Sequence, residues 1–140
     1  MFTRMANKTA SGVRLKVFIS HARADAGFAG QLAGFLEDNG FSLLREGADL
    51  GPDRRELVAA ADVLVLVLTA DASASDVCAW ELEEARQRGK HVIAVLPAPL
   101  RTPPPHDLLD ADRIYFYSDP GIPQSGFFDG QKRLQAALRS

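Results

Sequence analysis

Cysteine is nearly absent from this 140-residue chain, because Cys78 is the only one. A single cysteine excludes an internal disulfide and supplies no cysteine cluster for a metal ion. Long apolar runs are absent too, and none approaches the roughly 20 residues that a helix needs to cross a bilayer. The first residues, with Arg4 and Lys8, are not followed by an apolar core and do not read as a signal peptide or an anchor. We therefore expect a cytoplasmic protein without a membrane partner.

An excess of charge of one sign is also missing. The formal net charge is −2 and the isoelectric point is about 5.9, which gives no bulk electrostatic reason to bind nucleic acid. What the chain does have is an ordinary globular composition, with 46% hydrophobic residues. We expect one domain over residues 13–140, preceded by a flexible leader of small and polar residues at 1–12.

The stretch from Val63 to Arg88 is the centre of the predicted fold. Six consecutive apolar residues, Val63 to Leu68, are typical of a central parallel strand that is covered on both faces. Thr69 to Asp76 is a polar loop, and Val77 to Arg88 has the periodicity of a helix. The buried stripe of this helix is predicted at Cys78, Leu82 and Ala85. Its N-terminal cap is predicted at Ser75 or Asp76, and Gly89 is predicted to follow its C-terminal end.

Other strands and helices alternate along the chain. The same patterns predict strands at 14–20, 41–44, 91–96 and 113–117, a helix between a candidate cap at Asp25 and a stop at Asn39-Gly40, and helices at 54–61 and 127–139, the last with Phe127, Leu134 and Leu138 as its apolar face. This alternation predicts an α/β fold, a flavodoxin-like five-stranded parallel sheet in the order 2-1-3-4-5 with helices on both faces.

The predicted strand order brings two loops together. The first and third strands flank the switch point of such a sheet, where ligands bind beyond the carboxyl ends of the strands. The loop from Ser20 to Arg23 follows the first strand, and the loop from Thr69 to Asp76 follows the third. We therefore expect Ser20, His21, Arg23 and Glu81 to lie within reach of one ligand.

Four segments of the chain resemble a Toll/interleukin-1 receptor (TIR) domain, and specifically a bacterial one. VFISHARAD at 17–25 is similar to the first-strand motif of that family, and FAGQLAGFLEDNGF at 28–41 is similar to the helix that follows. The stretch from Ala61 to Leu96 is similar to the third strand, the site helix and the fourth strand. The end, IYFYSDPGIPQSGF at 114–127, resembles a tail found in a bacterial subset. Together these segments cover nearly all of the chain after Gly12.

The resemblance implies chemistry on NAD+. Many bacterial TIR domains cleave the bond between nicotinamide and ribose with a glutamate on the third helix, and Glu81 in CAWEL holds the matching position. Nicotinamide leaves as a neutral molecule, so the reaction needs no general acid. A fixed carboxylate can instead stabilise the oxocarbenium-like ribose or hold its hydroxyls. Water would give ADP-ribose and internal attack a cyclic product, and the sequence does not choose between them.

On this interpretation NAD+ is a substrate, and we expect no cofactor and no metal. Glu81 is the predicted catalytic residue, and the predicted substrate-binding residues are Phe18, Ser20, His21, Arg23, Thr69 and Trp80. We also expect self-association through TIR–TIR contacts and a fused or separate sensor domain.

Each of these residues has a simpler interpretation. Glu81 is alternatively a solvated residue favoured near a helix N-terminus. Trp80 either packs in the core or rim or stacks on a ligand. His21 is alternatively hydrogen-bonded to backbone, and Arg23 is either a surface charge or a bidentate partner of a phosphate. Cys78 reads as a small buried apolar residue.

The sequence departs from the TIR pattern in two places. The family often has tryptophan four residues before the glutamate, where this chain has Val77, and here the tryptophan sits beside the glutamate as Trp80. The segment from Arg45 to Ala61 is also short and lacks the usual aromatic residue. A second class of function therefore stays open, a non-catalytic module that signals through TIR–TIR contacts. A phosphorelay receiver is a weaker alternative, because the loop after the first strand offers no acidic metal site.

Overall fold

The computed structural model describes residues 14–44, 54–100, 112–123 and 125–139. The predicted leader at 1–12 and the predicted loop at 45–53 lie outside these residues. The helices and strands, in chain order, are β1 Lys16–Ser20, the short 3-10 helix η1 Arg23–Asp25, α1 Ala26–Asp38, β2 Ser42–Leu44, α2 Arg54–Ala60, β3 Val63–Val67, α3 Ala70–Ser73, α4 Asp76–Gln87, β4 His91–Leu96, β5 Asp112–Tyr115 and α5 Phe127–Arg139.

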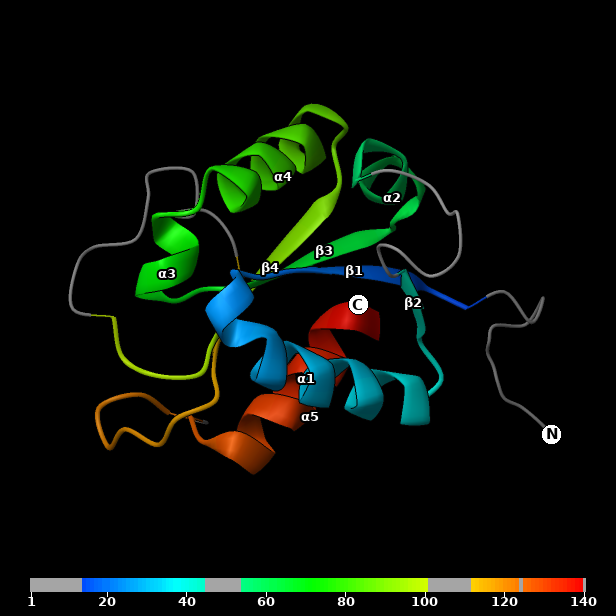
Figure 1. Cartoon of the computed structure of the whole chain (residues 1–140). Coiled ribbons are helices and arrows are strands. Elements are labelled where there is room, and N and C mark those ends of the chain that lie inside the picture. The colour runs from blue at the N-terminus through cyan, green and yellow to red at the C-terminus, as the bar shows by residue number, and fades with distance from the viewer. Residues whose placement is uncertain (1–13, 45–53, 101–111, 124, 140) are drawn as a thin grey trace, which may run out of the picture.

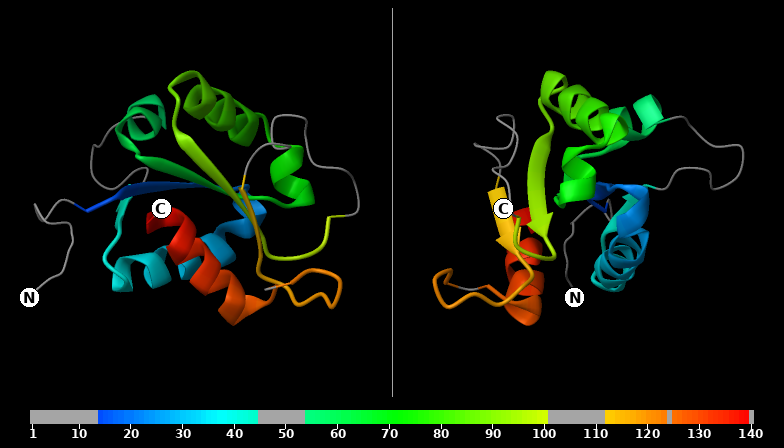
Figure 2. Two further views of the ribbon diagram at one scale, coloured as in Figure 1. Left: turned by 180° about the vertical axis from the view of Figure 1, so that it is seen from behind. Right: turned by 60° about the vertical axis from the view of Figure 1, so that its left-hand side comes forward.

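The strands form a five-stranded parallel sheet in the order β2-β1-β3-β4-β5, which confirms the predicted architecture. Val63 pairs with Val17 of β1 on one side and with His91 of β4 on the other. Helices α2 and α4 cover one face of the sheet, and α1 and α5 cover the other (Figure 1). Figure 2 shows the same layers from behind and from the side.

The alternating sequence of β3 divides the core into two clusters. Every residue of β3 is buried, and successive side chains of a strand point to opposite faces of the sheet. Leu64 and Leu66 pack toward α2 and α4, whereas the three valines pack toward α1 and α5. The unbroken apolar run therefore reflects a central strand with a helical layer on each face, as the sequence predicted.

One predicted loop contains a helical turn. The stretch Thr69–Asp76 was expected to be a loop, but Ala70–Ser73 forms α3. The Thr69 hydroxyl accepts a hydrogen bond from the amide of Ala72 at 3.1 Å and so caps this turn. The sequence interpretation was wrong because it took the small polar residues as turn formers and did not treat Thr69 as a cap.

Two other details also differ from the predictions. Asp25 precedes α1 as expected, but its side chain makes no capping hydrogen bond. Phe127 was placed on the buried face of α5, yet 47% of it is exposed, and the buried residues of the helix are Gly130, Leu134 and Leu138. Phe127 lies in the first turn of α5, where its ring makes a T-shaped contact with Phe116, with the ring centroids 5.9 Å apart.

Candidate active site at the carboxyl edge of the sheet

The side chain of Glu81 on α4 is a buried carboxylate in contact with the carboxyl end of β1. Glu81 has no solvent exposure and Ser20, the last residue of β1, is 1% exposed. The Ser20 hydroxyl donates a hydrogen bond of 2.6 Å to Oε1 of Glu81. The alternative that Glu81 is a solvated helix residue is therefore wrong. A buried carboxylate is costly for stability unless it is hydrogen-bonded, which makes this pair the leading candidate for a functional group.

The local sequence explains why Glu81 points inward. Ser75 caps α4 by accepting a hydrogen bond from the amide of Cys78 at 3.2 Å, and Gly89 follows the helix with a φ of 69°. Both predicted ends of the helix are thus confirmed. Glu81 follows Cys78 by three residues, so it falls on the same helix face. The buried residues of α4 are Cys78, Glu81, Leu82 and Ala85.

A second polar contact joins the two loops that the topology brings together. The Thr69 hydroxyl donates a hydrogen bond of 2.6 Å to Asp25, at the start of α1. Since the same hydroxyl caps α3, this contact ties the turn after β3 to the turn after β1. Sequence reasoning included Thr69 as a substrate-binding residue but missed its link to Asp25. A threonine directly after a buried strand was the available signal.

An open cleft of about 580 Å³ lies beside this carboxyl edge. Phe18, His21 and Arg23 line it from β1 and the turn that follows, and Ser75 and Val77 line it from the start of α4. Nδ1 of His21 lies 2.8 Å from the carbonyl oxygen of Ala22, so the simpler interpretation of this histidine as a backbone-bound loop residue is confirmed. Arg23 is exposed at the mouth of the cleft.

The opposite wall of the cleft consists of small side chains on α1. Their spacing of three and four residues places them on one face of the helix, and sequence reasoning did not single them out. The repeated glycine and alanine in AGFAGQLAGF was the signal. These residues are Ala26, Ala29, Gly30 and Ala33.

The structure thus divides the predicted site residues into groups. Phe18, His21 and Arg23 share the cleft, whereas Ser20 and Glu81 form a buried pair that is not part of its lining. Trp80 is also not part of the lining and is 37% exposed on α4. Trp80 is therefore not a core residue, whereas packing at the rim and contact with substrate both stay open.

The described residues offer no ready metal site or membrane helix. Within this part of the chain, His, Cys, Asp and Glu side chains nowhere form a group of three that could hold a metal ion. Cys78 is free and 3% exposed, which agrees with its prediction as a small apolar residue. Across the same residues, no helix has the length and apolar character that crossing a membrane requires.

Comparison with known proteins identifies the family. The sequence model of the TIR domain family matches residues 17–127, and the chain belongs to this family. The crystal structure of the TIR domain of the Toll-related receptor TRR-2 from Hydra magnipapillata is similar, with a TM-score of 0.68 and 16% sequence identity. The similarity covers 89% of this chain and 98% of that domain. A comparison with curated proteins gives no match.

Membership of the family bears on function at a general level. TIR domains include enzymes that cleave NAD+ and modules that act in signal transduction. They generally self-associate through TIR–TIR contacts. The likeness to the Hydra domain is a likeness of fold, since the two sequences share only 16% of their residues.

Proposed function

We propose that this TIR domain is an NAD+ hydrolase that cleaves the nicotinamide–ribose bond with Glu81 as its essential carboxylate. The observation that carries the proposal is the fully buried carboxylate of Glu81, bound by Ser20 at the carboxyl edge of the sheet. A hydrophobic residue at this position would avoid the cost of burying a charge. Retaining the charge is expected where the reaction needs it.

The chemistry requires little beyond this carboxylate. As the glycosidic bond breaks, its electron pair goes to the nicotinamide ring nitrogen, which loses its positive charge, and the ribose becomes an oxocarbenium-like cation. Glu81 stabilises that cation or holds the ribose hydroxyls, and the low dielectric of a buried site strengthens the interaction. Attack by water at the ribose carbon releases a proton and gives ADP-ribose. Attack by a nucleophile within the molecule gives a cyclic product.

The cleft supplies contacts for the rest of the substrate. Phe18 and His21 are among its lining residues, and the exposed Arg23 can bind the pyrophosphate through its planar guanidinium. Thr69 and Ser20 hold the two loops that border this site. Trp80 reaches the substrate in this scheme only if α4 or its surroundings rearrange.

In this proposal the described conformation is a resting one, because Glu81 is fully buried in it. A ribose contacts the carboxylate only after the side chains around Ser20 and Glu81 separate. We propose that self-association drives this change, and that the chain is the effector of a bacterial defence or stress system in the cytoplasm, coupled to a sensor domain. The isolated domain is then nearly inactive. This coupling follows the general tendency of TIR domains to self-associate.

A second function is favoured by the exposed apolar side chains on α4. Val77 is 45% exposed and Trp80 is 37% exposed, and exposed aromatic residues are frequent anchors of protein interfaces. In this alternative the domain is a non-catalytic interaction module. The buried Glu81 is then a structural residue, and NAD+ plays no part.

Nicotinamide release from NAD+ separates the two functions. The rate per molecule should be low for dilute protein and should rise when the chain is concentrated or fused to an oligomerising partner. The expected control is a fused Glu81→Gln variant, which should stay inactive. A wild-type chain that releases no nicotinamide when forced to oligomerise would leave the interaction module as the function.

A further inference from the structure

Trp80 lies on the solvent side of α4. The helix buries Cys78, Leu82 and Ala85 on its inner side, and the indole stands on the outer side with 37% of its surface exposed. A tryptophan is large, rigid and amphipathic, and such side chains are enriched at the centre of protein interfaces. The exposed indole is therefore a candidate knob for a contact with another molecule.

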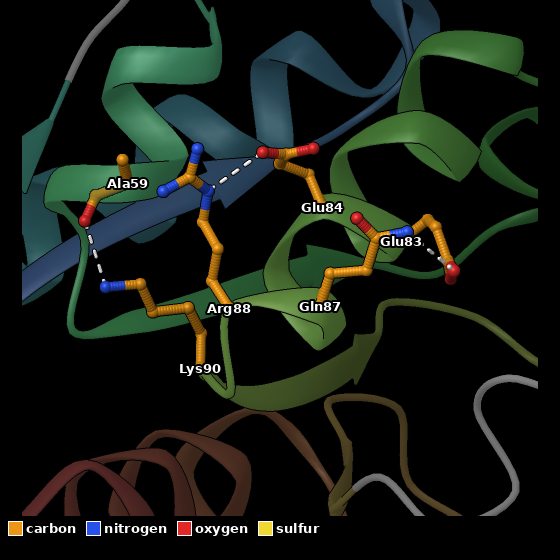
Figure 3. Close-up of polar contacts among 6 residues, drawn as sticks. All are labelled: Ala59, Glu83, Glu84, Gln87, Arg88 and Lys90. Carbon is orange, nitrogen blue, oxygen red and sulfur yellow. Dashed lines mark hydrogen bonds and ion pairs between the residues drawn. The ribbon is translucent and has the colours of Figure 1, made fainter.

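Two carboxylates flank this indole on the outer face of α4. Asp76 lies four residues before Trp80 and Glu83 three residues after it, so all of them share one exposed stripe. At 1.5 Å per residue the two carboxylates stand about 10 Å apart along the helix. Glu84 is already paired with Arg88 at 2.8 Å, and Gln87 approaches Glu83 only to 3.4 Å (Figure 3). Asp76 and Glu83 thus give the stripe its negative charge.

A groove of opposite charge lies between β5 and α5. Its volume is about 470 Å³, within the range of pockets that hold organic ligands larger than an indole. Small apolar residues form part of it, namely Ile114, Ala136 and Ala137, and the cations Arg113, Lys132 and Arg133 outnumber its one carboxylate, Asp112. That carboxylate also lies 3.0 Å from Nε2 of His91. The groove therefore presents apolar side chains together with an excess of cations.

We propose that the partner of this groove is a second copy of the chain, whose Trp80 inserts against Ala136. The charges match in either direction of the incoming helix. Lys132 lies one turn before Ala136, and Trp80 has a carboxylate about one turn away on each side, Asp76 or Glu83. One carboxylate therefore faces Lys132 or Arg133 when the indole is seated. Opposite charges on the two surfaces speed association and set the register of the incoming helix.

The positions of Trp80 on α4 and of the groove between β5 and α5 determine the kind of assembly. Helix α4 covers one face of the sheet and α5 the other (Figure 1), so a chain cannot fill its own groove with its own Trp80. The contact joins two different surfaces, so repeated copies assemble head to tail, as a ring or an open row. This inference does not depend on NAD+ cleavage, since it concerns association alone.

The first test measures the mass of the full 140-residue chain in solution as its concentration rises. Light scattering should show species larger than a monomer at high micromolar protein, and these should decline above about 0.5 M salt, where charges are screened beyond a few ångströms. Trp80→Ala and Ala136→Glu should each weaken association by more than about tenfold. The matched control is Phe128→Ala, which removes a 77% exposed aromatic from α5 outside the groove and should leave association unchanged.

The second test mixes two defective variants. Trp80→Ala keeps the groove and Ala136→Glu keeps the knob, so the mixture should form a one-to-one dimer and nothing larger. If Ala136→Glu does not fold, the double variant Lys132→Glu, Arg133→Glu closes the groove by charge, with circular dichroism as the check on folding. The inference is wrong if the wild type stays monomeric throughout, if Trp80→Ala associates like the wild type, or if the mixture stays monomeric.

Discussion

The two faces of the sheet differ in what they bury. On the α1 and α5 face, the packed cluster consists of apolar side chains from four strands and two helices. On the α2 and α4 face, a similar apolar cluster borders the Ser20–Glu81 pair, which are the buried polar side chains among the described residues. Among the described residues, one face buries apolar side chains, whereas the other also buries a hydrogen-bonded carboxylate. The following substitutions test that division.

The largest effect should come from Glu81→Gln in the enzyme that we propose. The carboxamide keeps the shape of the side chain but cannot offset a positive ribose, so turnover of the oligomerised chain should fall at least about 100-fold, the size typical of a lost electrostatic contact to a transition state. Thermal melting should change little, because the weakened hydrogen bond from Ser20 and the relief of the desolvation cost oppose each other. Nicotinamide release and a melting curve measure the two quantities.

A matched carboxylate on the same helix provides the control. Glu84 is partly buried and paired with Arg88. An ion pair near the surface contributes little energy, so Glu84→Gln should change turnover by less than about twofold. Equal losses of turnover in both variants would mean that any negative charge on α4 supports the reaction and that Glu81 has no special role. A Glu81→Gln variant that retains most of the wild-type rate would remove the catalytic assignment.

On the α1 and α5 face, shortening Leu134 should lower stability and leave turnover per folded molecule unchanged. Leu134 is fully buried in the α5 contact with the sheet, and Leu134→Ala should reduce the free energy of unfolding by about 2 to 5 kcal/mol. The midpoint of thermal unfolding should fall by roughly 10 °C. Phe128→Ala, at an exposed site on the same helix, should change stability by less than about 0.5 kcal/mol. A loss of turnover per folded molecule in Leu134→Ala would break the division between the faces.

The Ser20–Glu81 hydrogen bond should be measurable as a coupling energy. Ser20→Ala, Glu81→Met and the double variant form a cycle, because methionine cannot accept the bond as a carboxylate does, and a hydrogen bond to a charged group contributes about 1.5 to 3 kcal/mol to stability. Urea denaturation of the four proteins gives the coupling. A value near zero would mean that Ser20 and Glu81 do not depend on each other and would leave Ser20 free for a direct contact with substrate.

The smallest effects should come from two glycines that respond with opposite signs. A Cβ at Gly130 would lie 2.7 Å from the ring of Phe116, so Gly130→Ala should cost about 1 to 3 kcal/mol by overpacking. At Gly27 of α1 a Cβ meets nothing within 4 Å, and Gly27→Ala should stabilise the protein by about 0.5 to 1 kcal/mol. Equal shifts in denaturation midpoint would show that the α5 contact is not close-packed at Gly130.

Local sequence patterns were enough to predict the sheet. The apolar run of β3, the 3.6-residue periodicity of the helices and the stop signals at Gly40 and Gly89 are local features, and the predicted strand order was confirmed with most boundaries within a few residues. The position of Glu81 beside the carboxyl end of β1 also followed from sequence, because a parallel sheet brings those loops to one edge.

The grouping of the site residues depends on contacts between segments that are far apart in the chain. Whether Glu81 faces solvent or the core depends on how α4 rotates against β1, and that is set by packing across 61 residues of chain. The Asp25–Thr69 contact and the placement of Trp80 outside the cleft arise in the same way. Local patterns record which residues can be buried, whereas contacts between distant segments decide which polar atoms meet.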